Sequence, residues 1–267
     1  MSKNVLPNRE PFQKRTGMDE GNLRLVSASA IFSGILPGHL RDLLRDSAVQ
    51  DFPRNSILFL QGDDARRIYI VLEGWIKIFL ATPDGRETIL RVCGVGDSFA
   101  EAAMFERDGY LTSACTCTEV RVLGVPTATF KTHIFTNREL RERILLTMSQ
   151  KYRLLTYRIE ELSSQSAAQR LARFLLSLCP PEDETAIVRL PLPKGVIAAA
   201  LGMQPETFSR LLSKFRSDGV QVNGDIVSIA NVRKLHHHSK GTSSESVSTP
   251  YDINSQEPIF ARPGLNG

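Results

Sequence analysis

The sequence contains little of what marks a membrane protein, a secreted protein or a disulfide-rich scaffold. Its longest uninterrupted apolar stretch covers residues 196–201, far fewer than the about 20 residues that a helix needs to cross a bilayer. The N-terminus is polar and carries acidic residues, so the apolar core of a signal peptide is missing. Four cysteines among 267 residues do not form a disulfide framework. We therefore expect a cytoplasmic protein that does not associate with membranes.

Motifs of common enzymes are also missing. The sequence has no glycine-rich phosphate loop, no nucleophile motif of a catalytic triad and no zinc-protease motif, so we expect a protein that is not an enzyme. The chain is 42% hydrophobic and 23% charged, as is usual for a soluble globular protein. Its length allows one large domain or two small ones. The net charge of +4 is too small to identify a partner by itself.

Residues 51–127 alternate short runs of Val, Ile, Leu, Phe and Thr with glycine turns. Regular short strands with turn signals predict an antiparallel sandwich or barrel. The clearest strands are expected at 68–72, 75–80, 87–93, 112–117 and 120–125. Asp84-Gly85 is a favoured dipeptide for a tight hairpin turn.

A long helix is expected after this region, because residues 138–163 contain neither proline nor glycine. Asn137 can cap its start. Apolar residues follow one another at spacings of three and four, which is the pattern of a helix packed along another helix. They are Leu145, Met148, Tyr152, Leu155, Ile159 and Leu162. Because charged residues leave only a narrow apolar stripe, we favour a dimer seam over packing on the helix's own domain.

Residues 194–213 carry the spacing of a helix-turn-helix. Ala198 provides a small residue where two helices cross, and Gly202 can take the positive φ of the turn. Pro205 fits the first turn of the second helix, where its missing N–H costs nothing. Two short strands flank Asn223-Gly224, a hairpin signal that can form a wing. An ordinary helical hairpin is the alternative.

If the second helix enters a DNA major groove, its first turns present one set of polar side chains. These are Gln204, Glu206, Thr207, Ser209, Arg210 and, one turn later, Lys214. Arginine can bond guanine O6 and N7, and glutamate can accept from cytosine N4. Glu206 and Arg210 are four residues apart and lie on one helix face, so they could instead form a solvated ion pair.

The positive charge is concentrated in this part of the chain. Residues 164–235 contain nine Lys and Arg against six Asp and Glu. Basic residues suited to phosphate contacts are Lys194, Arg210, Lys214, Arg216, Arg233 and Lys234. Phosphate contacts of this kind make binding depend on salt. We therefore expect double-stranded DNA as the partner.

Together these features resemble the CRP/FNR superfamily of bacterial transcription regulators. The resemblance covers residues 30–235 and rests on the glycine turns at Gly62, Gly74 and Gly96, on the segment 96–101, and on the segment 201–210. It implies an α+β fold with an antiparallel β-roll of the cyclic-nucleotide-binding type, a long dimerisation helix and a winged helix-turn-helix. The expected divisions are a flexible arm (1–27), the β-roll sensor (28–135), the dimerisation helix (136–163), the DNA-binding domain (164–235) and a disordered tail (236–267).

The sequence departs from the members that bind cyclic AMP. Those members carry Gly-Glu-Leu and, about ten residues later, Arg-Ser or Arg-Thr. Here Glu101 is kept, Ala100 replaces the glycine, and Leu111-Thr112 stands in place of the arginine pair. A cyclic phosphate would meet a leucine, which is costly without a partner for its charge. We expect no response to cyclic AMP, and place another effector beside Phe99, Glu101, Leu111 and Thr112.

The segment 206–210 reproduces the Glu-x-x-Ser-Arg pattern of the FNR branch. By resemblance, a homodimer is expected to bind TTGAT half-sites repeated as a palindrome. An iron–sulfur cluster is not expected, since no cysteine precedes Cys93. The segment 99–105 resembles the Dnr/NnrR-type regulators of denitrification, which implies haem and nitric oxide sensing. A FixK-like activator without a cofactor, controlled by its abundance, and a β-roll subunit that binds no DNA are the alternatives.

Further residues are candidates for a cofactor or a partner. His39 and His133 are the only histidines in the sensor half and are candidate haem ligands. Met104, Tyr110 and the cysteines are other conceivable ligands, although buried inert thiols are the simpler interpretation of the cysteines. The expected hairpin tip at Asp84, Arg86 and Glu87 resembles the loop by which family members contact RNA polymerase. A merely exposed hairpin is the alternative.

Overall fold

The computed structural model describes residues 12–82, 85, 87–180 and 184–239. The helices are α1 (Phe12–Thr16), α2 (Glu20–Ala28), α3 (Pro37–Leu43), α4 (Thr127–Thr136), α5 (Arg138–Ser164), α6 (Ala167–Leu178), α7 (Lys194–Ala200), α8 (Pro205–Lys214) and α9 (Val232–Ser239). Two 3-10 turns are η1 (Ala102–Phe105) and η2 (Phe215–Asp218). The strands are β1 (Ala48–Phe52), β2 (Ile57–Phe59), β3 (Arg67–Glu73), β4 (Ile76–Ala81), β5 (Glu87–Cys93), β6 (Ser98–Phe99), β7 (Ser113–Thr116), β8 (Val120–Pro126), β9 (Ala186–Arg189), β10 (Val220–Asn223) and β11 (Ile226–Ile229).

The chain divides into two compact units. One unit comprises Met1–Ile76 and Cys93–Met148, and the other comprises Lys77–Val92 and Ser149–Gly267. The division falls inside α5, so the C-terminal half of this helix belongs with the helix-turn-helix elements. Within the described ranges, no helix has the length and apolar character needed to span a membrane.

The N-terminal segment is helical from Phe12, so the prediction of a flexible arm over 1–27 is wrong for its described residues. The carboxylate of Asp19 accepts the backbone N–H of Asn22 at 2.7 Å and caps α2. Met18 and Val26 are buried, with exposed fractions of 1% and 0%. Burial of these side chains outweighs the weak helical pattern of the segment, because removal of apolar surface from water drives packing.

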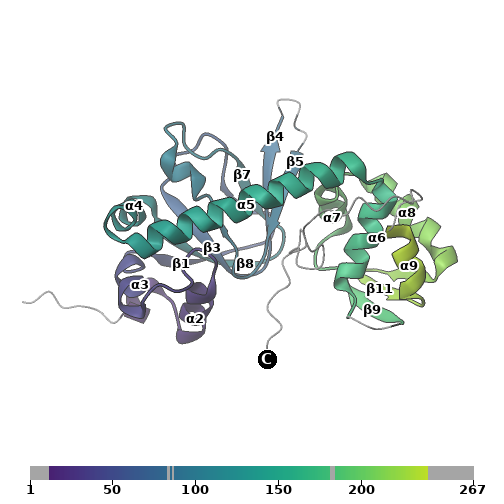
Figure 1. The fold of residues 1–267 in the computed structure, drawn as a ribbon, viewed down its shortest axis with the longest axis horizontal. Helices are drawn as coiled ribbons and strands as arrows, with labels where there is room; N and C mark the ends of the chain where they lie inside the picture. Colours follow the sequence, from purple (N-terminus) through teal and green to yellow (C-terminus); the bar gives the residue numbers. More distant parts are fainter. Residues whose placement is uncertain (1–11, 83–84, 86, 181–183, 240–267) are drawn as a thin grey trace, which may run out of the picture. The chain divides into compact units, whose positions relative to one another are not determined.

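Two antiparallel four-stranded sheets form the β-roll, with strand orders β1-β8-β3-β6 and β2-β7-β4-β5. In the first sheet, shown in Figure 1, Ala48 pairs with Gly124 and Ile68 pairs with Val125. The five predicted strands are confirmed within one or two residues at each end. Strands β1, β2 and β6 are additional to the prediction, because their sequences alternate less clearly between apolar and polar residues.

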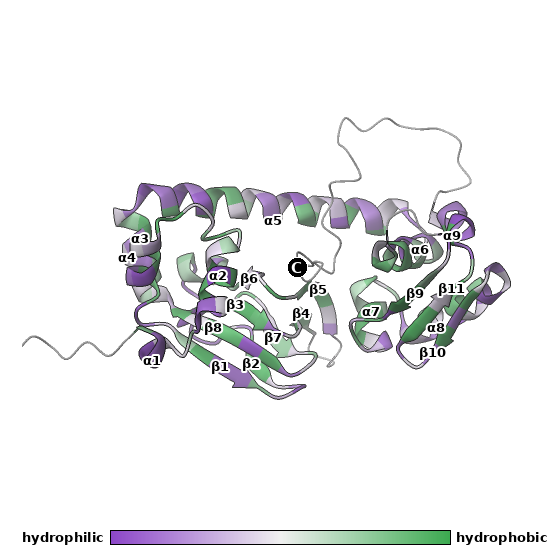
Figure 2. Ribbon diagram, turned by 90° about the horizontal axis from the view of Figure 1, so that it is seen from below, coloured by the Kyte–Doolittle hydropathy of each residue, from purple (hydrophilic) through white to green (hydrophobic). Residues whose placement is uncertain are grey.

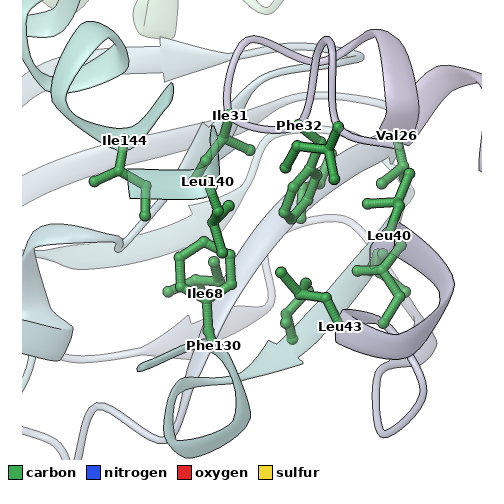
Figure 3. Packing of buried hydrophobic residues seen from close by; sticks show 14 of the residues in the cluster. Val26, Ile31, Phe32, Leu40, Leu43, Ile68, Phe130, Leu140 and Ile144 are labelled. Carbon is green, nitrogen blue, oxygen red and sulfur yellow. The ribbon is translucent and has the colours of Figure 1, made fainter. Parts of the chain in front are cut away.

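One hydrophobic core joins α2, α3, α4 and the start of α5 to the first sheet. Figure 3 shows the rings of Phe32 and Phe130 among aliphatic side chains, and their centroids lie 5.9 Å apart in an edge-to-face arrangement. Leu140 and Ile144 of α5 are buried in the same cluster. The first turns of α5 are therefore held by the β-roll.

A stack of four aromatic rings fills the interior between the two sheets of the β-roll. The ring centroids of Phe59 and Tyr110 lie 3.7 Å apart, and those of Tyr69 and Phe99 lie 5.3 Å apart. The Tyr110 hydroxyl donates to the Arg67 carbonyl at 2.8 Å. Burial, followed by the influence of the neighbouring phenol of Tyr69, raises the pKa of Tyr110. The shift agrees with a buried phenol that keeps its proton and its hydrogen bond to the Arg67 carbonyl.

Helix α5 begins and ends as predicted. The Asn137 side-chain oxygen accepts the Leu140 backbone N–H at 3.0 Å, and the helix runs to Ser164. Figure 2 shows hydrophobic positions recurring along α5 among hydrophilic ones. The helix therefore carries apolar side chains in addition to Leu140 and Ile144, which are buried in the core cluster.

The helix-turn-helix part contains the two helices and the hairpin predicted for it, together with α6, β9, η2 and α9. Helix α6 starts with a capping box, in which the Ser166 and Gln169 side chains accept one another's backbone N–H groups. Strands β10, β11 and β9 form an antiparallel sheet in that order. Asn223 pairs with Ile226 across the turn that contains Gly224, at φ +61°. The hairpin predicted from Asn223-Gly224 is thus confirmed.

The histidines at 236–238 continue helix α9, so the prediction that the tail starts at residue 236 is wrong for 236–239. The His238 Nε2 atom lies 2.9 Å from Asp218 Oδ2, and its ring centroid lies 4.8 Å from that of Phe215. These contacts hold the last turn of α9 against η2. Residues 240–267, the rest of the predicted tail, lie outside the described residues.

We expect His238→Ala to destabilise the helix-turn-helix part by about 1–2 kcal/mol, because it removes a hydrogen bond and a ring contact. His237→Ala is the matched control, since His237 is exposed in the same helix turn. Urea unfolding followed by circular dichroism measures both variants. Equal midpoints for the two variants would contradict a structural role for His238.

Candidate nucleic-acid interface

Helices α7 and α8 are joined by a turn that contains Gly202, and two features of the structure require glycine at this position. Gly202 has φ +65°, a conformation that residues with a Cβ atom adopt only at a cost. A Cβ atom at this position would also lie 2.5 Å from Leu162 Cδ2. Pro205 occupies the first turn of α8. The turn chemistry predicted from Gly202 and Pro205 is therefore confirmed.

The two faces of α8 differ sharply. Phe208 and Leu212 are buried, with exposed fractions of 0% and 6%, and they lock the helix onto the domain together with Leu201 and Ala198. Leu211 of the same helix is only partly buried. Because Leu212 lies four residues after Phe208, it shares the buried face.

The opposite face of α8 presents the polar side chains that were predicted to face the DNA major groove. The exposed ones are Gln204, Glu206, Ser209, Arg210 and Lys214, and Thr207 is partly buried. Arg210 Nη2 donates to Thr207 Oγ1 at 3.3 Å. Among the described residues, Glu206 and Arg210 form no ion pair, which is contrary to the alternative interpretation of their spacing. Both charged groups point away from the protein's own core and can contact another molecule.

The surrounding basic residues are not equivalent. Lys194, Lys214, Arg216 and Lys234 are exposed. Arg233 Nη2 lies 2.7 Å from Glu184 Oε1, in a pair that is exposed on both sides and therefore of small energetic value. Arg233 would have to exchange this carboxylate for a phosphate. Within the described residues, Lys194, Lys214, Arg216 and Lys234 form no ion pair, so they are the better phosphate contacts.

The apolar stripe on α5 is open to solvent. The exposed fractions are 69% for Leu145, 72% for Tyr152, 53% for Leu155, 67% for Ile159 and 44% for Leu162. Met148, predicted for the same seam, packs partly buried against the core of the β-roll. A contiguous exposed apolar stripe of this kind marks an interaction surface.

The residues predicted for the effector pocket fall into different environments. Phe99 is buried in the aromatic stack, and Glu101 is buried at the start of η1. Leu111 is 45% exposed, and Thr112 is partly buried. The structure therefore brings Phe99 and Glu101 into the interior of the β-roll and leaves Leu111 at its surface.

Alanine at position 100, where the members that bind cyclic AMP carry glycine, strains the backbone. Ala100 has φ +69°, a conformation that costs an L-residue about 1–2 kcal/mol. Ala100→Gly is therefore expected to stabilise the β-roll by about 0.5–1 kcal/mol after the entropy of the more flexible unfolded chain is counted. Ala102→Gly is the control, because Ala102 lies exposed in η1. Thermal unfolding that shows no gain for Ala100→Gly over Ala102→Gly would contradict the strain.

The two haem-ligand candidates lie in one pocket. His39 and His133 line it together with Asp42, Arg138 and Glu139, among others, and His39 Nδ1 lies 3.4 Å from Asn137 Nδ2. Cofactor pockets are mostly lined by hydrophobic side chains, so this polar lining does not fit a haem. In the described part of the chain, no three His, Cys, Asp or Glu side chains are grouped to hold a metal ion. All four cysteines are buried, as expected.

The hairpin predicted to contact RNA polymerase is described only in part. Asp84 and Arg86 lie outside the described residues. Glu87 forms an ion pair with Lys77, which belongs to the preceding strand. One of the three predicted contact residues is thus paired within its own hairpin.

Comparisons with known proteins agree with this architecture. The cyclic nucleotide-binding domain matches residues 49–137, and the Crp-like helix-turn-helix domain matches residues 169–237. The chain is 28% identical over 228 residues to the CRP-like cAMP-activated global transcriptional regulator of Mycobacterium tuberculosis (strain ATCC 25618 / H37Rv), with 84% of this chain and 100% of the relative covered. It is 30% identical over 194 residues to the fumarate and nitrate reduction regulatory protein of Vibrio cholerae, with 71% and 77% covered.

A solved structure extends the agreement. A crystal structure of a protein from Ruegeria pomeroyi DSS-3 has a TM-score of 0.59 and 32% identity to this chain, with 82% of this chain and 97% of that chain covered. The fold and the exposed face of α8 define a protein in which a β-roll of the cyclic-nucleotide-binding type precedes a helix-turn-helix. The chain belongs to the CRP/FNR family of transcription regulators.

Proposed function

We propose that this chain is a homodimeric transcription regulator, without enzymatic activity, that binds palindromes of TTGAT half-sites. The observation that carries the proposal is the division of α8 into a buried face, with Phe208, and an exposed face, with Glu206 and Arg210. Such a helix can enter the major groove without losing its own packing. Arg210 would bond guanine O6 and N7, and Glu206 would accept from cytosine N4.

Dimerisation explains the remaining exposed features. The stripe of Tyr152, Leu155 and Ile159 on α5 would pack against the same stripe of a second copy, as in other paired helices with this spacing. Two recognition helices related by a two-fold axis match half-sites one helical turn apart. The palindrome and the dimer therefore have the same symmetry.

Binding to duplexes of defined sequence tests the proposal. The purified full chain should bind a TTGAT palindrome at least about 1,000-fold more tightly than a scrambled duplex at 150 mM salt. Affinity should fall as salt increases, since phosphate contacts release counterions. Equal affinity for both duplexes would overturn the sequence-specific function, and no binding to either would favour the β-roll subunit that binds no DNA.

The effector is expected to differ from cyclic AMP. The relative from Mycobacterium tuberculosis is named as cAMP-activated, whereas Leu111 here offers no charge to a phosphate and is 45% exposed. Isothermal titration of the full chain with cyclic AMP should give no binding heat. A DNA affinity that rises with cyclic AMP would overturn this expectation.

Control of denitrification genes through nitric oxide and haem is the finer proposal that the resemblance supports. Because the pocket of His39 and His133 is polar, a bound haem would have to use other residues. A Soret band after reconstitution, with a spectral change under nitric oxide, would support haem. Tight binding of the palindrome without any ligand would instead favour the FixK-like activator. We also propose that the regulator contacts RNA polymerase through the hairpin residues Asp84, Arg86 and Glu87.

A further inference from the structure

The C-terminal end of α7 has an unusual distribution of hydrogen bonds. The last four carbonyl groups of a helix have no partner within the helix. Here Ile197, Ala198 and Ala199 accept the backbone N–H groups of residues 201–203, at 2.8–3.0 Å. The three carbonyl groups that follow, at residues 200–202, accept from side chains instead. Those side chains come from two other helices.

Two arginines supply these donors. Arg158 of α5 donates through Nη2 to the Ala200 carbonyl. Arg170 of α6 donates through Nε to the Leu201 carbonyl at 2.8 Å and through Nη2 to the Gly202 carbonyl at 3.3 Å. Each guanidinium group can serve several acceptors because it carries five N–H donors. Three consecutive carbonyls of the turn are thus held by α5 and α6.

Both arginines are largely buried and bond groups of their own chain. The Arg158 side chain is 15% exposed and forms an ion pair with Glu161 at 2.5 Å. Arg170 is 8% exposed, and burial, followed by the charge of Arg158, lowers its pKa. Two like charges are brought together at the turn, with Glu161 as the nearby opposite charge. Removal of the Arg158 guanidinium would take the side-chain donor from the Ala200 carbonyl, and removal of the Arg170 guanidinium would take it from the buried Leu201 carbonyl. Leaving a buried acceptor without a donor is costly.

An apolar contact closes the same site. The Leu162 side chain lies against Gly202, where any Cβ atom would collide with its Cδ2 atom. Leu162 is four residues after Arg158, so both project from neighbouring positions on α5. Leu162 therefore contacts the turn of its own chain, in addition to the place predicted for it in the seam.

We propose that Arg158, Leu162 and Arg170 form a clasp that fixes the α7–α8 turn to the C-terminal end of α5, and that Arg158 is a positioning residue for DNA recognition. The seam residues Leu155 and Ile159 lie within one turn of Arg158 on α5. In a dimer, the clasp sets the distance between the two recognition helices, because it ties each turn to the seam. This inference rests on the proposed DNA-binding function.

The test compares three variants of the full chain. Arg158→Gln removes the charge and the paired donors, and Arg158→Lys keeps the charge but cannot serve Glu161 and Ala200 together. Arg153→Gln is the matched control, since Arg153 is exposed on the same helix. Affinity is measured for the TTGAT palindrome and for a duplex with one extra base pair between the half-sites. Each affinity is measured across a series of salt concentrations.

Both Arg158 variants should bind the palindrome roughly tenfold more weakly, the size expected for the loss of a charged hydrogen bond. Their salt slope should equal that of the wild type, because Arg158 contacts no phosphate. They should also discriminate less against the duplex with altered spacing. Wild-type affinity in Arg158→Lys with a loss only in Arg158→Gln would assign Arg158 a purely electrostatic role and overturn the clasp.

A measurement without DNA separates the clasp from the proposed function. Hydrogen exchange of the amides at 201–203 should be faster in both Arg158 variants than in Arg153→Gln, because the turn loses its anchor. If the wild-type chain binds no duplex, the proposed function is wrong. The hydrogen-exchange rates at 201–203 then still show whether the clasp exists. Unchanged exchange in both Arg158 variants would overturn it.

Discussion

Arg210→Ala is expected to weaken binding to the TTGAT palindrome strongly and to remove the preference at one base pair of each half-site. A bidentate contact between arginine and guanine contributes about 1–3 kcal/mol of discrimination, which corresponds to a roughly 5- to 150-fold rise in Kd for each half-site. Arg210 is exposed, and its hydrogen bond to Thr207 is long, at 3.3 Å, so its loss should leave the stability of the domain unchanged. Fluorescence anisotropy with a panel of single-base variants of the duplex measures both effects.

Two further variants separate base reading from charge. Arg210→Lys keeps the charge but loses the planar pair of donors, so it should lose the base preference and keep the salt slope. Lys214→Ala should weaken binding about equally for all duplexes and reduce the salt slope by about one. If Arg210→Ala weakened all duplexes to the same degree, Arg210 would contact phosphate, and the proposed reading of TTGAT by this residue would be wrong.

The helix-turn-helix and its hairpin could be predicted well because residues close together in the sequence specify them. Gly202 and Pro205 stand at fixed positions in the turn, and the hairpin is specified by Asn223-Gly224. These residues constrain the backbone directly, through positive φ or a fixed φ. The same holds for α5, whose start is capped by Asn137 and whose length follows from the lack of proline and glycine.

Features that depend on distant contacts could not be predicted from the sequence. The helix around Val26 has a weak amphipathic pattern and is held by the core. Phe59 and Tyr110 stack at 3.7 Å although they are far apart in the chain. The sequence does not single out Arg158 or Arg170, because nothing in their spacing indicates the distant carbonyls that they bond.

Ile159→Glu is expected to convert the proposed dimer into a monomer and to lower the affinity for the palindrome by about 100-fold or more, the gain that simultaneous binding of two sites provides. Ile159 is 67% exposed in the single chain, so the substitution should not unfold it, whereas a carboxylate within a closed seam would be buried without a partner. Gln150→Glu is the matched control, because Gln150 is exposed and lies on the side of α5 opposite Ile159 by helical periodicity. Sedimentation velocity and DNA titration measure mass and affinity together. A dimer that persists in Ile159→Glu would place the interface elsewhere, and a monomeric wild type would mean that the exposed stripe on α5 serves another partner.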